Sequence, residues 1–147
     1  MWKRLLLVMS VLVGACSAER AALAPLGEGA PAASQIDWAG AAPLDVALQD
    51  FEFMPSRIEL ARQQAYRLHL TNRGGGHNFD TPDFFRSVVF RDDAVSQRAR
   101  SSGGVIELAG GESLDVYVLP VRDGRYALRC SHVLHSTFGM TGEIVVN

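Results

Sequence analysis

The chain has 147 residues, of which 48% are hydrophobic and 20% charged, and its formal net charge is −2. This length suits one globular domain, and the composition excludes a disordered, highly charged tail. With 14 basic against 16 acidic residues there is no excess of cations to neutralise a phosphate backbone, so we expect no nucleic-acid partner. The two cysteines, Cys16 and Cys130, are compatible with one disulfide until their surroundings are considered.

The first residues have the order of a secretory signal: a cationic start with Lys3 and Arg4, an apolar run over 5–13, and small residues before Cys16. The apolar run is shorter than the ~20 residues that a membrane-spanning helix needs. Residues 13–16, Val-Gly-Ala-Cys, resemble a bacterial lipobox, which implies cleavage after residue 15 and a lipid on Cys16. An ordinary signal peptide that happens to contain a cysteine is the alternative.

Lipidation of Cys16 implies an exported protein that is held on the periplasmic side of a membrane by its lipid anchor only. Ser17 follows the cysteine in place of aspartate, which resembles sorting to the outer membrane more than retention in the inner one. A soluble periplasmic protein is the alternative. A lipidated Cys16 could not pair with Cys130, so we expect no disulfide.

Residues 16–43 are predicted to be a flexible linker, because they are rich in Ala, Gly and Pro and lack helical or alternating periodicity. Trp38 in this segment is compatible with a contact onto the folded domain and equally with a solvated aromatic. The predicted organisation is a signal peptide at 1–15, a lipid-anchored flexible linker at 16–43 and one domain at 44–147.

Residues 44–147 have the pattern of an all-β domain, in which six or seven short alternating segments are separated by turns, and this favours a β-sandwich. The segments are 44–53, 58–60, 66–70, 105–108, 114–118, 124–130 and 143–146. A phase slip between Leu48 and Phe51 predicts a bulge in the first segment. One short helix is expected over 81–89, where Thr81 is a candidate N-cap before Pro82 and the apolar residues have helical spacing.

Three metal donors lie close together near the C-terminus, in the run Cys130-x4-His135-x4-Met140. A thiolate, an imidazole and a thioether form a soft set that suits copper and suits magnesium or calcium poorly. His77, which follows three glycines, supplies a fourth donor. A buried structural cysteine beside incidental histidines is the alternative, but it does not explain the spacing. His69, on the outward face of its strand, is expected to be solvated.

At these residues the chain is similar to the cupredoxins, the type 1 or blue copper proteins, and the similarity covers 44–147. It implies a Greek-key β-sandwich with one mononuclear copper ion at one end. Four residues match the family's ligands, namely two imidazoles (His77 and His135), the equatorial thiolate (Cys130) and the weak axial thioether (Met140). Asn78 matches the family residue that hydrogen-bonds to the residue after the cysteine, here Ser131, and so ties the two ligand-bearing loops together.

His132 departs from the simplest family pattern, because it adds a second histidine to the loop. The shorter loop of some cupredoxins, with the ligand three residues after Cys130, does not apply because position 133 is valine. We expect His132 to lie at the surface or beside the site. A ligand role for His132, or a zinc site built from Cys and His, remains an alternative.

The resemblance implies a one-electron carrier that cycles between Cu(I) and Cu(II), and it implies no enzyme activity. Arg129 and Ser131 flank Cys130 where multicopper oxidases have histidines, a single cysteine excludes a binuclear dithiolate centre, and the chain is too short for a two-domain nitrite reductase. The alternative is a non-redox protein of copper trafficking, storage or resistance, which four internal ligands disfavour.

Electron transfer of this kind implies redox partner proteins that dock transiently on an apolar patch near His135. The candidate patch residues are Val133, Leu134, Phe138, Phe79, Phe84 and Phe85. Phe84 and Phe85 are equally compatible with a place in the core. We expect the protein to be a monomer.

Overall fold

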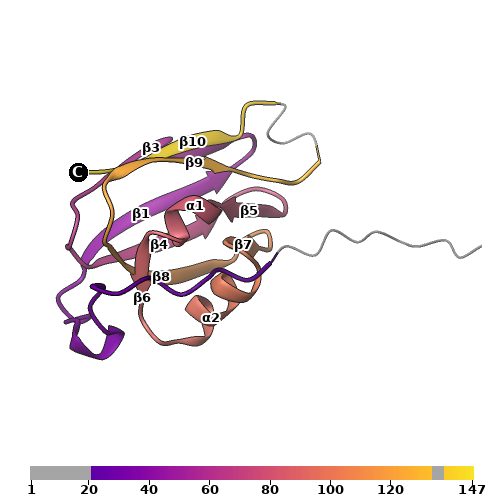
Figure 1. The fold of residues 1–147 in the computed structure, drawn as a ribbon. Coiled ribbons are helices and arrows are strands. Elements are labelled where there is room, and N and C mark those ends of the chain that lie inside the picture. The colour runs from indigo at the N-terminus through magenta and orange to yellow at the C-terminus, as the bar shows by residue number, and fades with distance from the viewer. Residues whose placement is uncertain (1–20, 134–137) are drawn as a thin grey trace, which may run out of the picture.

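The computed structural model describes residues 21–133 and 138–147, and in these residues the chain folds as two five-stranded β-sheets (Figure 1). The strands are β1 (Ala42–Gln49), β2 (Glu52–Met54), β3 (Arg57–Leu60), β4 (Tyr66–Asn72), β5 (His77–Asp80), β6 (Val88–Phe90), β7 (Val105–Leu108), β8 (Ser113–Pro120), β9 (Gly124–Arg129) and β10 (Thr141–Val146). The strand orders are β2-β1-β4-β8-β6 and β3-β10-β9-β5-β7. The predicted β-sandwich is confirmed.

The core lies between the sheets because alternate residues of each strand face inward. In β4 the buried residues are Leu68, Leu70 and Asn72, every second residue, whereas those between them are only partly covered. Three phenylalanines that were candidates for a docking patch also belong to this core: Phe79, Phe84 and Phe85 are at most 2% exposed. Their assignment to the patch is therefore wrong, because their rings fill the space between the sheets.

The helix expected over 81–89 is confirmed only in its first half. Helix α1 (Pro82–Phe85) ends after one turn, and Val88–Phe90 form strand β6, which pairs with β8. Apolar pairs three or four residues apart fit either structure, and the β-branched valines favour the strand. Thr81 does not cap the helix with its side chain; its hydroxyl donates to the carbonyl of Ala127 instead, at 2.9 Å.

Helix α2 (Ala94–Ser101) was not predicted. It begins at Asp93, whose carboxylate accepts the backbone N–H of Ser96 at 2.8 Å, a normal N-cap. Burial raises the pKa of Asp93, but the hydrogen bonds from Ser96 and Arg91 outweigh burial and leave the pKa below its ordinary value. In the sequence, Asp93 as a possible N-cap was the feature that could have predicted α2.

The phase slip between Leu48 and Phe51 is a hairpin turn and not a bulge. β2 runs back antiparallel to β1, with Leu48 opposite Phe53 and Gln49 opposite Glu52. Asp50 and Phe51 form the tip, where Phe51 has a φ of +68°, which is uncommon for an aromatic residue. The turn brings Asp50 to the end of the sandwich where β5 begins.

The strand directions bring three sequence-distant segments to one end of the sandwich. β9 is antiparallel to both β5 and β10, so the start of β5, the end of β9 and the start of β10 lie together. These three positions carry His77, Cys130 and Met140.

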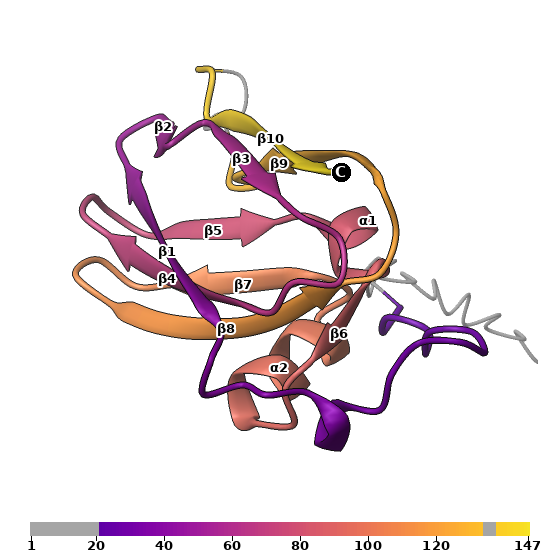
Figure 2. The same ribbon diagram turned by 90° about the vertical axis from the view of Figure 1, so that its left-hand side faces the viewer.

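Residues 23–41, here called the N-terminal strap, lie against the outside of the domain and pass α2, β6 and β8 (Figure 2). The backbone N–H of Leu23 donates to the carbonyl of Arg100 at 2.9 Å. Trp38 donates from Nε1 to the carbonyl of Ala33 at 2.9 Å, and its ring meets Tyr117 edge-on. Of the two interpretations of Trp38, the contact with the domain is therefore the one observed.

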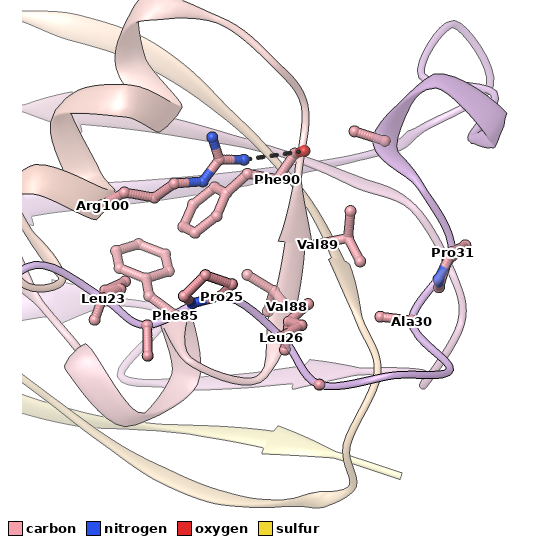
Figure 3. Close-up of a pocket in the computed structure, with 13 residues that line it drawn as sticks. Leu23, Pro25, Leu26, Ala30, Pro31, Phe85, Val88, Val89, Phe90 and Arg100 are labelled. Atoms are coloured by element: carbon pink, nitrogen blue, oxygen red, sulfur yellow. Dashed lines mark hydrogen bonds between the residues drawn. The ribbon is translucent and has the colours of Figure 1, made fainter.

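The flexible linker expected over 16–43 stays a prediction, and residues 23–41 of it contact the domain in this structure. The contacts of the strap with the domain are made by a few apolar side chains. These are irregularly spaced in the sequence, so no periodic pattern indicates them. Leu23, Pro25 and Leu26 of the strap line a groove of about 460 Å³ together with Phe85 and Val88. Figure 3 shows these side chains. The predicted signal peptide and Cys16 lie outside the described residues. Within those residues, no helix has the length and apolar character needed to cross a membrane.

Candidate metal centre

His77 is the first residue of β5 and is 1% exposed. The loop before it is held by Asn72, a buried amide on the inner face of β4. The Asn72 side chain accepts the N–H of Gly74 at 3.0 Å and donates to the carbonyl of Leu108 at 2.9 Å. It also donates to the carbonyls of Ala109 and Gly75. The position of His77 is therefore set by a buried polar network and by pairing with β7.

Gly74 makes room for a contact between His77 and the β1–β2 turn. The Nε2 atom of His77 lies 3.6 Å from Oδ1 of Asp50. A Cβ atom on Gly74 would lie 2.5 Å from that oxygen and 2.8 Å from Nε2, so a larger residue would displace one of them. With Nε2 facing the carboxylate, Nδ1 is left to face Cys130. Asp50 gave no sequence signal, because only the tertiary fold brings its turn to β5.

Cys130 follows β9 directly and is a fully buried thiol. Its Sγ lies 3.9 Å from Nδ1 of His77. Its backbone N–H donates to the carbonyl of Met140 at 3.1 Å, and the Met140 side chain is also fully buried. The structure thus brings three of the four predicted donor residues to one buried end of the sandwich.

The pair formed by His77 and Cys130 fits a single metal ion. Typical bonds from a first-row metal to imidazole nitrogen and thiolate sulfur sum to about 4.4 Å. Since the two donor atoms are 3.9 Å apart, one ion can bond to both. His135 lies outside the described residues, and in the described ranges 21–133 and 138–147 no three His, Cys, Asp or Glu side chains form a cluster that could hold a metal. The complete ligand set stays a prediction.

Asn78 and Ser131 join the two segments through a pair of hydrogen bonds. The amide oxygen of Asn78 accepts the backbone N–H of Ser131 at 2.8 Å, and its Nδ2 donates to the Ser131 hydroxyl at 3.0 Å. The arrangement is the one that the family resemblance implies for these residues.

His132 is held beside the site by both of its ring nitrogens. Nδ1 lies 2.9 Å from the carbonyl oxygen of Gly76, and Nε2 lies 2.8 Å from Oε2 of Glu107. His69, expected to be solvated, is instead half-buried, with Nδ1 2.7 Å from Oδ1 of Asp115. Glu107, like Asp50, was not singled out from the sequence, because its strand-face position resembles that of any exposed carboxylate.

Apolar side chains are exposed on the β9–β10 loop and on the adjoining β1–β2 turn. Val133 is 86% exposed and Phe138 62%, as expected for the predicted patch. Phe51 and Met54 add exposed apolar surface that the sequence did not indicate, and the rings of Phe51 and Phe138 are in contact at a centroid distance of 5.3 Å. Leu134 lies outside the described residues.

Solved structures with a similar fold identify the architecture. One is a dithionite-reduced auracyanin from the photosynthetic bacterium Roseiflexus castenholzii, with a TM-score of 0.50 and 17% identity over 74% of this chain and 99% of that one. Another is auracyanin B, with a TM-score of 0.50 and 19% identity over 73% of this chain and 89% of that one. No family model and no curated protein matches the sequence. Auracyanins are cupredoxins, and the chain has the cupredoxin fold.

Proposed function

We propose that the protein is a one-electron carrier with one mononuclear copper ion, bound by His77, Cys130, His135 and Met140. The observation that carries the proposal is the 3.9 Å approach of a buried imidazole nitrogen to a buried thiol sulfur. The cupredoxin fold and the soft donor set support it. Copper would supply the chemistry, a change of one electron between Cu(I) and Cu(II).

The chain's own residues would keep the site rigid and dry. Burial of His77, Cys130 and Met140 excludes water from three of the proposed donors. The bonds of Asn78 to Ser131 hold the thiolate segment against the imidazole strand. A ligand set that changes little between the two oxidation states favours rapid electron transfer, and it leaves no evident position for a substrate. We therefore infer a carrier and not an enzyme.

The exposed apolar residues beside the site supply a docking surface in this proposal. Val133, Phe138, Phe51 and Met54 would meet a redox partner protein near His135. A small apolar contact suits a transient encounter, because electron carriers must dissociate after each transfer.

Copper spectroscopy on the mature chain tests the proposal. Addition of Cu(II) should produce an intense visible band from thiolate-to-copper charge transfer, and Cys130→Ala should abolish it. His69→Ala is the matched control, since His69 lies on the outer face of β4 beside Asp115 and should leave the band intact. A chain that binds zinc but forms no coloured Cu(II) species would refute the type 1 site.

Redox cycling separates the carrier from a copper-handling protein. A carrier should be reduced and reoxidised repeatedly with the same amount of copper bound. Transfer of copper to an accepting protein without any change of oxidation state would favour trafficking or storage instead.

We further propose that Cys16 carries a lipid and anchors the protein on the periplasmic side, preferably at the outer membrane. The supporting observation is the Val-Gly-Ala-Cys sequence at 13–16, followed by Ser17. Mass spectrometry of the mature N-terminus should find a lipidated Cys16, and Cys16→Ser should release the protein from the membrane fraction. An unmodified N-terminus at another residue would favour the soluble periplasmic form.

A further inference from the structure

The backbone contact between β5 and β9 is short, although the segments at their ends carry His77 and Cys130. In the described residues their register contains one pair, Asp80 opposite Arg129. That pair lies at the end of β5 away from His77. At the site end, side chains must therefore hold the two segments together.

Glu107 of β7 lies at the centre of these side-chain contacts. It is opposite Asn78 in the register of β5 and β7. Its Oε1 accepts from Nδ2 of Asn78 at 2.8 Å, and its Oε2 lies 2.8 Å from Nε2 of His132. The other ring nitrogen of His132 reaches the carbonyl of Gly76, in the loop before His77, at 2.9 Å. The contacts run from β7 to the cysteine loop and back to the loop before β5.

We propose that Glu107 and His132 are positioning residues that close a clasp over the site, made of Glu107, His132 and the Gly76 carbonyl. The clasp restrains the loop that follows Cys130 and thereby slows the loss of the bound copper. This inference rests on the proposed function, because the copper ion is the one proposed above.

Glu107 also fixes the orientation of the Asn78 amide. A carboxylate offers only acceptors, so it selects the NH2 side of the amide. The Asn78 oxygen is then turned toward Ser131, where it accepts the backbone N–H. A reversed amide would place its oxygen against the Glu107 carboxylate. It would lose the hydrogen bond to Glu107 and the one from the Ser131 N–H. Glu107 thus acts on the cysteine loop by two routes, through His132 and through Asn78.

The clasp also accounts for the second histidine of the cysteine loop. Both ring nitrogens of His132 face protein oxygens within 3 Å, so in this geometry neither is directed at a metal. The imidazole size matters because the ring spans the distance between the β7 carboxylate and the Gly76 carbonyl.

The rate of copper release tests the clasp. The mature chain is loaded with Cu(II), excess EDTA is added, and the decay of the visible band is followed at constant pH. Glu107→Ala and His132→Ala should each release copper about tenfold faster, in the range that partners of metal ligands show. The double variant should be little faster than Glu107→Ala alone, because removal of Glu107 already opens the clasp that His132 completes. Glu59→Ala, which removes an exposed carboxylate paired with Arg57 on β3, should not change the rate.

Hydrogen exchange of the copper-free protein gives a second, metal-independent measurement. In Glu107→Ala the backbone N–H of Ser131 should exchange about tenfold faster, because its acceptor on Asn78 loses its fixed orientation. The N–H of Cys130 should keep its rate, since it donates to the backbone of Met140. The Glu107 side chain is exposed and that of His132 is partly exposed, so both variants should unfold at nearly the wild-type temperature.

Each outcome separates the clasp from the proposed function. If the protein is coloured and both Glu107→Ala and His132→Ala release copper at the wild-type rate, the clasp is overturned and the carrier stands. Loss of the visible band in His132→Ala would identify His132 as a ligand and also overturn the clasp. If the wild type forms no coloured Cu(II) species, the proposed function fails, and the exchange rate of the Ser131 N–H in Glu107→Ala still decides whether Glu107 positions the segment after Cys130 through Asn78.

Discussion

The two sides of the candidate metal centre are built differently. The strand side, residues 72–80, is backed by β7 and by the buried Asn72 network, and all four residues of β5 are buried. The loop side, from Cys130 to Met140, buries the two end residues but exposes Val133 and Phe138 between them. The strand side holds the His77 imidazole among buried contacts, and the loop side combines the buried Cys130 and Met140 with exposed apolar residues.

This difference indicates that the two sides have separate tasks. Changes on the strand side should damage the fold and the position of His77, because its contacts are buried and cannot relax. Changes on the loop side should leave stability nearly intact and alter the properties of the bound ion or the docking of partners.

The largest effect is expected for Asn72→Ala. The substitution removes four hydrogen bonds, and the carbonyls of Leu108, in a buried contact, and Ala109, in a partly buried one, lose the Asn72 donor. We expect a loss of about 3 kcal/mol in the free energy of unfolding, at the upper end for an unsatisfied buried group. Denaturant unfolding of the copper-free protein measures it. Thr71→Ala is the control, because the neighbouring Thr71 hydroxyl only accepts an exposed hydrogen bond from Ser113. It should lower the free energy of unfolding by less than about 0.5 kcal/mol.

Gly74→Ala should weaken copper binding by about tenfold, the size expected when a partner of a metal ligand is displaced. The new Cβ would press on the exposed Asp50 carboxylate, which can swing away, and on the buried His77 ring, which cannot. Competition with a chelator measures the dissociation constant. Gly75→Ala is the control, because a Cβ there meets no atom within 4 Å. Equal affinities of the two variants would contradict the role of Gly74.

Met140→Leu tests the loop side at its buried end. The side chains have similar volume and the backbone bond to Cys130 is kept, so the free energy of unfolding should change by less than about 1.5 kcal/mol. Removal of a weak thioether donor should shift the visible band and raise the reduction potential, since Cu(II) loses more than Cu(I). Voltammetry and absorption spectra measure both. An unchanged potential and spectrum would exclude Met140 from the ligand set.

Phe138→Ala should have a small effect on stability, about 0.5–1 kcal/mol from the lost ring contact with Phe51. The copper spectrum should stay the same, because the ring lies at the surface. Electron-transfer rates with a partner protein should fall if the exposed patch is the docking surface. Val133→Ser, which changes an even more exposed side chain, should leave stability unchanged and lower the same rates.

The sequence predicted the sandwich and the spacing of the donors because both follow local rules, alternation within strands and short separations within one loop. It did not predict the strand at Val88–Phe90, because apolar spacing there fits more than one element. It did not predict α2, because that mostly polar segment has little apolar periodicity. Asp50 and Glu107 were missed because their importance depends on which turns and strands become neighbours. His132 was noticed as an extra histidine, but its two partners are contributed by distant segments.

The N-terminal strap would limit the distance between the domain and the membrane if the proposed lipid anchor is present. If Cys16 carries the proposed lipid, the chain between the anchor and the first docked residue, Leu23, is the six residues 17–22. Six residues reach at most about 20 Å when fully extended, whereas a free linker over 16–43 could reach roughly 95 Å. The shorter reach would confine the carrier to a thin layer next to the lipid surface. Its partners would then be proteins of the same membrane, met by diffusion in two dimensions.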